Sequence, residues 1–257
     1  MTEPLETQGE RIAKVLARRG VCSRREAERL IAEGLVSVNG EVLTTPAFKV
    51  TEAAAIKVRG VPVPGESRTR LWRYHKPAGL MTTHRDPQGR PTVFERLPPE
   101  LPRVLSIGRL DLNSEGLLLL TNDGELSRAL ELPSNGWRRR YRVRVFGKPS
   151  AADLDRLKTG VSVDGERLKA EEASLDSTRG DNTWLTIVLT EGKNREIRRM
   201  LEVIGVRVNR LIRLAYGPFQ LGELGRGAIE EVPPKVMREQ LGSLLKPVRK
   251  QRADRRG

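Results

Sequence analysis

The chain has 257 residues, with 47 Lys and Arg against 33 Asp and Glu, which gives a formal net charge of +14. This basic excess favours a polyanionic partner, either nucleic acid or an anionic membrane, over a small neutral substrate alone. Cys22 is the one cysteine, which excludes an internal disulfide and a cysteine-based zinc site, and two histidines, His75 and His84, predict no metal cluster. Since no apolar run approaches the ~20 residues of a membrane span and residues 1–10 are too polar for a signal peptide, we expect a cytoplasmic protein.

Two helices and a hairpin are predicted first along the chain. Apolar residues at helical spacing precede Gly20, which can end a helix in the left-handed conformation. Ser23 lies three residues before Glu26, the spacing of a capping box at the start of a second helix, and this helix ends at Gly34. Asn39-Gly40 then favours a tight hairpin turn between two short apolar segments.

The domain organisation follows from shifts in composition. The segment VPVPGESR suits a linker, because its prolines, glycine and polar residues disfavour regular structure. The last residues carry six basic side chains against one acid, which is typical of a disordered arm. We therefore predict a disordered N-terminus at 1–9, a compact first unit at 10–60, a linker at 61–70, a larger second unit at 71–243 and a basic disordered tail at 244–257.

The second unit is predicted to be an α+β domain with a mixed, mainly antiparallel sheet and packed helices. Its short apolar runs come in adjacent pairs with occasional helices between them, unlike the strict alternation of a doubly wound fold. Strands are expected at RLWRY, at 117–120, at YRVRVFG and at TWLTIVLT, and helices near 125–132, 151–157 and 195–204.

Five arginines gather around the helix-turn-helix of the first unit, where backbone amides and guanidinium groups can converge on phosphates. The alternative interpretation is a solvated helix face. The stretch GVCSRREAERLIAEGLVSVNG resembles the RNA-binding module first described in ribosomal small-subunit protein four. This resemblance implies that the first unit is an RNA-binding domain.

A single carboxylate stands out in the second unit. Asp111 lies between Gly108 and Gly116 at the mouth of a very apolar strand, where a side chain is held on rigid structure yet stays open to a ligand. Taken alone, an aspartate in such a position is more often a turn or cap residue than a catalyst. GRLDLNSEGLLLLTNDG resembles the signature of the pseudouridine synthases of the RsuA/RluB branch, whose members carry such an RNA-binding module in front. The resemblance implies that Asp111 is the nucleophile, although Ser114 stands where the family more often has Thr.

Further motifs along 71–230 agree with this resemblance. YHKPAG and DPQGRPTVFERLP are similar to segments of the same branch, and RRRYRVRVFG holds the family's active-site tyrosine position at Tyr141. EGKNREIRRM resembles the last family motif, whose arginine, the partner of the nucleophile, matches Arg198. Without the resemblance, Tyr141 could be a core residue and Arg198 could stabilise a helix. Glu196, where the superfamily often has Gln, is given no role.

The implied function is isomerisation of one uridine in 23S rRNA to pseudouridine, of the uridine 2605 type. A small-subunit 16S rRNA synthase and a non-catalytic rRNA-binding assembly factor remain the alternatives. The expected partner is rRNA or a pre-ribosomal particle, and the enzyme is expected to be monomeric, with no cofactor and no metal. The side chains expected to contact RNA are Arg18, Arg19, Arg24, Arg25, Arg29, Lys76, Arg109, Arg138, Arg139, Arg140, Lys193, Arg195 and Arg199.

Overall fold

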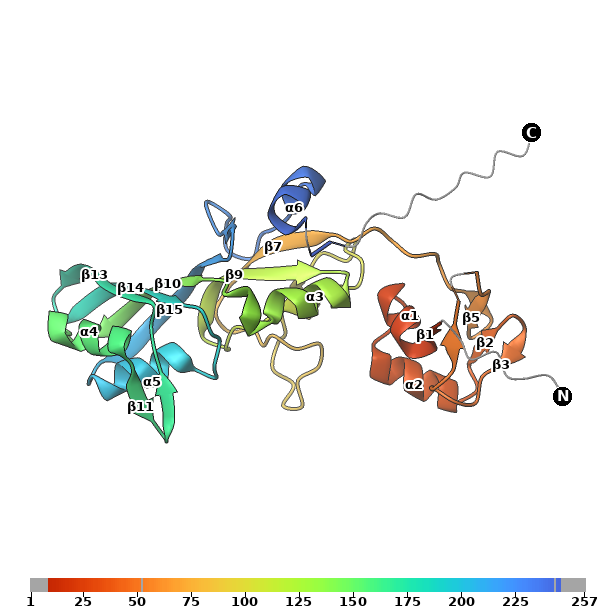
Figure 1. The fold of residues 1–257 in the computed structure, drawn as a ribbon, viewed down its shortest axis with the longest axis horizontal. Coiled ribbons are helices and arrows are strands. Elements are labelled where there is room, and N and C mark those ends of the chain that lie inside the picture. The colour runs from red at the N-terminus through yellow and green to blue at the C-terminus, as the bar shows by residue number, and fades with distance from the viewer. Residues whose placement is uncertain (1–8, 52, 243, 246–257) are drawn as a thin grey trace.

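The computed structural model describes residues 9–51, 53–242, 244 and 245, which form a small first unit and a larger second unit (Figure 1). Most of the two predicted disordered ends, 1–9 and 244–257, lies outside the described residues. The elements of the first unit are β1 (Glu10–Arg11), α1 (Ile12–Arg18), α2 (Arg24–Ala32), β2 (Val36–Val38), β3 (Glu41–Val42), β4 (Lys49–Val50), β5 (Ile56–Val58) and β6 (Val61–Pro62).

Local signals in the first unit act as predicted, with one exception. Gly20 and Gly34 have φ of +77° and +70° after the two helices, and the Asn39-Gly40 turn has positive φ at both residues, as a tight hairpin requires. Ser23 accepts a hydrogen bond from the amide of Glu26 at 3.1 Å. The capping box is only half formed, however, because the Glu26 carboxylate pairs with Arg29 of the same helix.

The boundary of the first unit differs from the prediction by two residues. Strand β6, at Val61–Pro62, pairs with β5, so the four-stranded sheet β3-β2-β5-β6 extends past residue 60 into the predicted linker. Proline is tolerated there because β6 is an edge strand, whose outer side needs no amide donor. The apolar sides of α1 and α2 and this small sheet form a separate hydrophobic core.

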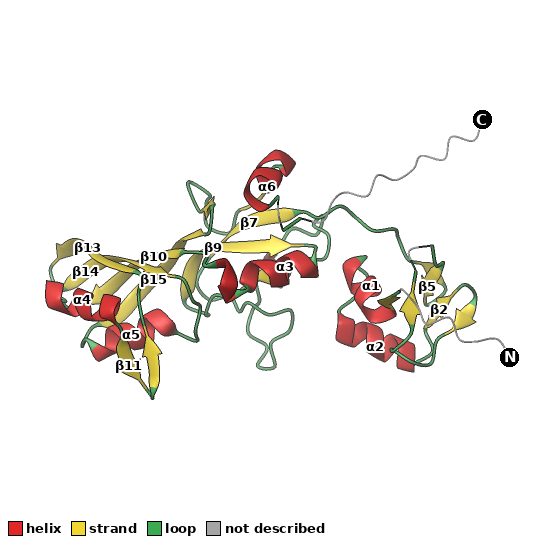
Figure 2. Ribbon diagram, viewed as in Figure 1, coloured by secondary structure: helices red, strands yellow, loops and turns green. Residues whose placement is uncertain are grey.

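The second unit is built on a mixed, mainly antiparallel sheet with packed helices, which confirms the predicted α+β class (Figure 2). Its main strand order is β13-β14-β10-β15-β9-β7-β17, and β15 and β9 form a parallel pair. The strands are β7 (Leu71–Lys76), β8 (Leu105–Ile107), β9 (Ser114–Thr121), β10 (Arg139–Phe146), β13 (Glu172–Arg179), β14 (Asn182–Leu189), β15 (Arg207–Tyr216), β16 (Phe219–Gln220) and β17 (Ile229–Glu231), with a separate hairpin of β11 (Val161–Val163) and β12 (Glu166–Leu168).

The helices of the second unit are α3 (Gly124–Glu131), α4 (Ala151–Thr159), α5 (Glu196–Val203) and α6 (Pro234–Leu241), with 3-10 turns at Phe94–Arg96 and Pro133–Asn135. The predicted strands correspond to β7, β9, β10 and β14, and the predicted helices to α3, α4 and α5. Strands β13 and β15, the β11–β12 hairpin and helix α6 were not predicted. Within the described chain, no helix is both long and apolar enough to cross a bilayer.

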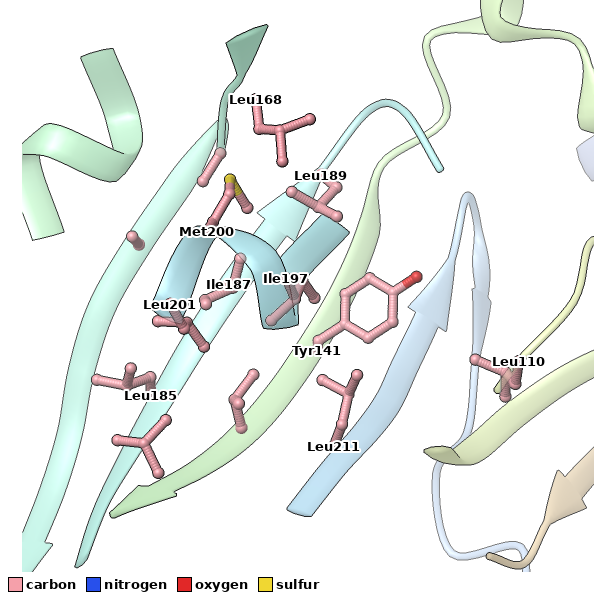
Figure 3. Packing of buried hydrophobic residues seen from close by; sticks show 14 of the residues in the cluster. Leu110, Tyr141, Leu168, Leu185, Ile187, Leu189, Ile197, Met200, Leu201 and Leu211 are labelled. Atoms are coloured by element: carbon pink, nitrogen blue, oxygen red, sulfur yellow. The ribbon is translucent and has the colours of Figure 1, made fainter. Parts of the chain in front are cut away.

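Strand β10 separates the two faces of the sheet. Its odd-numbered residues are buried and its even-numbered residues are exposed, in strict alternation. Tyr141, Val143 and Val145 belong to the main core together with residues of α4 and α5. Figure 3 shows this packing, with Tyr141 beside Ile197 of α5 and Leu211 of β15. One face of this part of the sheet is therefore covered by α4 and α5.

Candidate active site

Asp111 lies in the loop that joins β8 to β9. The loop turns tightly, because the amide of Ser114 donates to the carbonyl of Asp111 at 3.0 Å, and β9 begins directly at Ser114. The Asp111 side chain is 37% exposed. A carboxylate at the start of a fully buried strand is thus held close to rigid structure while its oxygens stay accessible.

Lys76 fixes this loop from the end of β7. Its Nζ lies 3.1 Å from the carbonyl oxygen of Asp111, 3.3 Å from that of Leu112, 2.9 Å from that of Ser114 and 3.1 Å from that of Pro77. Lys76 is completely buried, and its predicted contact with RNA is therefore wrong. The lysine of the YHKPAG motif is enclosed by backbone carbonyls because β7 and β9 are neighbouring strands.

Burial lowers the pKa of Lys76 to about 8, against the opposing effect of the nearby carboxylates of Asp111 and Glu115. Desolvation penalises the charged ammonium, whereas carbonyl acceptors and negative charges stabilise it. The three protons of the ammonium meet four acceptors. The position of the loop consequently depends on one buried cation.

Two further contacts hold the same loop. The Thr82 hydroxyl donates to the carbonyl of Leu110 at 2.8 Å and accepts from its amide at 3.3 Å. The amide of Gly79 donates to the carbonyl of Leu112 at 2.7 Å. Asp111 is therefore flanked on both sides by residues that the segment after β7 holds in place. Sequence reasoning missed Thr82, and no local signal in its surroundings identifies it.

Gly116 brings the Asp111 loop to the helix α5 region. It has φ of +102°, and a Cβ at this position would lie 2.3 Å from the backbone oxygen of Arg213 and 2.7 Å from its nitrogen. Only a residue without a side chain permits this approach between the parallel strands β9 and β15. Because β15 begins at Arg207, shortly after α5 ends at Val203, this strand pairing joins the segment that contains α5 to the strand that follows the Asp111 loop.

Arg195, the residue directly before α5, faces Asp111. The Nη1 atom of Arg195 lies 4.0 Å from Oδ2 of Asp111. Arg195 has φ of +49°, a backbone conformation that costs about 1–3 kcal/mol for a residue with a side chain and is found preferentially at functional sites. Sequence reasoning assigned this residue to RNA binding and did not foresee its position beside the carboxylate.

Arg198 lies nearby but makes a different set of contacts. Its guanidinium donates to the carbonyls of Val208 at 3.4 Å and Asn113 at 3.5 Å, and within the described residues it forms no ion pair with Asp111. Burial lowers the pKa of Arg198, with Arg195 acting in the same direction and Asp111 opposing it. The predicted direct pairing of Asp111 with Arg198 is thus replaced by one with Arg195, because Arg198 extends along the β15 backbone.

Tyr141 lies on the buried face of β10 and is 8% exposed. Figure 3 shows its hydroxyl pointing away from the aliphatic cluster, toward the side on which Leu110 lies. Leu110 directly precedes Asp111 in the chain. The tyrosine ring is packed against Ile197 and Leu211 through its apolar body, so its orientation is fixed by the core.

Several predicted RNA contacts are instead structural. Arg139 is 8% exposed and donates to the carbonyl of Thr190 at 2.6 Å and to the Tyr216 hydroxyl at 3.1 Å, so its predicted RNA contact is wrong. Arg199 pairs with Glu166 at 2.8 Å and holds the β11–β12 hairpin against α5. The alternation of buried and exposed residues on β10 turns Arg139 inward. The sequence RRRYRVRVF alone does not fix which of its neighbouring arginines faces the core, because a shift of one residue exchanges the two faces of a strand.

The other predicted contacts lie at or near the surface. Arg18 pairs with Glu10 and with Glu66, and Arg138 pairs with Glu171 and Glu172. The remaining candidates are exposed or partly exposed side chains: Arg19, Arg24, Arg25, Arg29, Arg109, Arg140, Lys193 and Arg195. Within the described residues, no three His, Cys, Asp or Glu side chains come together in a group that could hold a metal ion.

Comparison with known proteins agrees with this architecture. Residues 70–203 match the family described as RNA pseudouridylate synthase, and residues 10–56 match the S4 domain. The chain therefore belongs to the RNA pseudouridylate synthase family and carries an S4 domain in front of the family domain. The site around Asp111 lies inside the matched region, in the loop between β8 and β9.

The chain is similar over nearly its whole length to several members of this family. It is 48% identical over 228 residues to an uncharacterized RNA pseudouridine synthase of Rickettsia felis, covering 89% of this chain and 99% of that protein. It is 43% identical to a ribosomal large subunit pseudouridine synthase B of Salmonella typhi, covering 87% and 79%. A crystal structure of a pseudouridylate synthase superimposes with a TM-score of 0.61 at 25% identity, covering 90% and 99%.

Proposed function

We propose that this chain isomerises a uridine of large-subunit rRNA to pseudouridine, with Asp111 as the nucleophile. The observation that carries the proposal is a partly exposed carboxylate on a loop fixed by Lys76, with Arg195 at 4.0 Å. The choice of rRNA rests on the S4 domain, on the net charge of +14 and on the name of the Salmonella typhi relative. A polyanion as large as rRNA suits such a surface.

The reaction balances without an external donor or acceptor. The bond between N1 and C1′ of the ribose breaks, a bond between C5 and C1′ forms, the C5 proton leaves and N1 gains a proton. No electrons are exchanged, so the proposal requires no cofactor. Attack of the carboxylate at C1′, its addition at C6 and a glycal route all have this balance, and each uses one ionised carboxylate beside the nucleoside.

Each neighbour of Asp111 has a distinct part in the proposal. Arg195 places its guanidinium 4.0 Å from the Asp111 carboxylate, and Arg198 lies nearby and holds the carbonyl of Asn113 in the same loop. Tyr141 stacks on the uracil and assists removal of the C5 proton. The uridine must leave its stack to reach Asp111, which costs a few kcal/mol and less in a loop than in a paired stem. The surface arginines of the S4 domain offset this cost through phosphate contacts.

Asp111→Asn tests the assignment. Because the amide keeps the shape of the carboxylate but is not a nucleophile, we expect no pseudouridine in transcribed rRNA fragments and nearly unchanged RNA affinity. Asp155→Asn is the matched control, since Asp155 is an exposed acid on α4 and its loss should leave the rate unchanged. RNA with 5-fluorouridine at the target should form a stable adduct with the wild-type chain only. Pseudouridine formation by Asp111→Asn would overturn the proposed role.

Mapping of the pseudouridines in rRNA from cells that lack the protein identifies the target nucleotide. The same experiment distinguishes the proposed function from a 16S rRNA synthase and from a non-catalytic assembly factor. The proposal expects one missing site in the large subunit, and a site of the uridine 2605 type is the expected one. A missing site in 16S rRNA would assign the small-subunit alternative, and a complete set of pseudouridines would favour the assembly factor. Fractionation and sizing of the full chain test the expected cytoplasmic, monomeric state.

A further inference from the structure

The face of the sheet opposite Tyr141 carries a row of arginines. Arg140, Arg142 and Arg144 alternate on β10 with the buried residues of the core and are exposed. Figure 2 shows α4 and α5 along the other face of β13, β14, β10 and β15, and Tyr141 points to that covered face with α5. The arginine row is therefore on the face of the sheet opposite Tyr141 and α5.

Aromatic side chains lie between these arginines. The guanidinium of Arg142 lies 4.7 Å from the ring centre of Trp184 on β14, and that of Arg207 on β15 lies 5.8 Å from the ring centre of Phe146. Strand pairing places Arg144 opposite Trp184 and Phe146 opposite Arg207. Phe146 is 49% exposed, one of the few large apolar side chains on the surface of the described residues. We call Arg142, Arg144, Phe146, Trp184 and Arg207 the arginine face.

The charge of the arginine face is poorly balanced by acids. Arg142 pairs with Asp176 at 3.7 Å. Within the described residues, neither Arg144 nor Arg207 has an ion pair with a carboxylate. Guanidinium groups bind phosphate through paired donors and also stack on flat rings, which lysines do less well. Two rings between three guanidinium groups match a strand whose bases are free to stack, because the base faces of a duplex are already stacked on one another.

We propose that the arginine face binds single-stranded RNA while the target uridine occupies the opposite face. The proposal goes beyond the isomerisation, because a strand on this face does not reach Asp111 through the sheet. Its phosphates contact Arg142, Arg144 and Arg207, and its bases stack on Trp184 and Phe146. The enzyme would thereby hold two segments of one rRNA, or of a pre-ribosomal particle, on the two sides of the sheet.

Binding of a 12-nucleotide oligocytidylate by the full chain tests this surface, because this probe contains no uridine that could react. Replacing two of the phosphate contacts in Arg142→Gln/Arg144→Gln should reduce the slope of log affinity against log salt by about 1.4. The affinity at ~0.15 M salt should fall about tenfold. Lys235→Gln/Arg238→Gln is the matched control, because it removes the same charge from the exposed side of α6 and should change neither quantity.

Trp184→Leu separates stacking from charge. It should weaken oligocytidylate binding at least about fivefold without changing the salt slope and should leave binding of a 12-base-pair RNA duplex unchanged. Both arginine-face variants should isomerise a short rRNA fragment at the wild-type rate. Failure of the wild-type chain to isomerise this fragment would contradict the proposed function and would leave the arginine face to be judged by its binding data. Unchanged oligocytidylate affinity in Arg142→Gln/Arg144→Gln, or equal losses for oligomer and duplex in Trp184→Leu, would overturn the arginine face as a single-strand site.

Discussion

Lys76→Met isolates the effect of one buried cation on the Asp111 loop. Methionine fills most of the volume of the lysine stem but donates no hydrogen bonds, so the carbonyls of Asp111, Leu112 and Ser114 lose their shared donor. The change leaves the Asp111 carboxylate itself chemically intact. Any loss of rate therefore reports on the position of the loop.

The expected magnitude follows from the contacts. Three hydrogen bonds from a charged donor contribute about 1.5–3 kcal/mol each, or about 4–9 kcal/mol together, and burying the ammonium costs several kcal/mol in return. We expect a net loss of about 3–5 kcal/mol in the free energy of unfolding, as for removal of one partner from a buried ionic contact. At about 2–4 °C per kcal/mol for a domain of this size, Tm should fall by about 6–20 °C.

The assay combines thermal unfolding with initial rates of pseudouridine formation well below the new Tm. Because a displacement of ~1 Å at a reacting group can cost about 100-fold in rate, the rate should fall by that order while RNA affinity changes little. Lys235→Met is the control, since this side chain is 81% exposed. A Tm within about 2 °C of the wild type together with an unchanged rate would refute the role assigned to Lys76.

Three further outcomes are expected. Since the pKa of Lys76 is lowered to about 8 and an unfolded lysine titrates near ~10.4, the unfolded state binds more protons between these pH values. The free energy of unfolding of the wild type relative to that of Lys76→Met should then rise over that range, while the rate of pseudouridine formation by the wild type falls. Thermal unfolding and initial rates measured at each pH will check both. Gly116→Ala forces a Cβ to within 2.3 Å of the Arg213 backbone and should cost at least about 3 kcal/mol in urea unfolding; an unshifted midpoint would contradict this. Burial raises the pKa of the Cys22 thiol, so iodoacetamide should label it only after unfolding, and rapid labelling of the folded chain would speak against its burial.

Residues whose effect is local were predictable from the sequence. Ser23 caps α2, and the Asn39-Gly40 turn adopts the positive φ values that its residue types favour. Each of these signals acts on the backbone within about four residues, so the local structure at these positions can be predicted from the neighbouring residues in the sequence. The same holds for β10, whose alternating RVRVF reads directly as one buried and one exposed face.

Errors arose where a side chain finds its partner at long range. Lys76 was expected to contact RNA, but it is completely buried and donates to the carbonyl of Asp111, 35 residues away. Strand β15 was missed because its alternating pattern includes an arginine, Arg213, that is 2% exposed. Tertiary packing overrides residue preference at both positions, since buried acceptors need a donor whatever residue supplies it.

The sequence by itself determined that the protein is strongly basic, that its first unit has the pattern of an RNA-binding module, and that Asp111 lies in a motif that resembles the pseudouridine synthase signature. Only the tertiary structure decided which arginine faces that carboxylate and which cation holds its loop. The physical reason is the parallel pairing of β9 with β15, in which the two backbones approach closely at Gly116. It joins segments far apart in the chain by backbone contact, and no pattern within either segment specifies that contact.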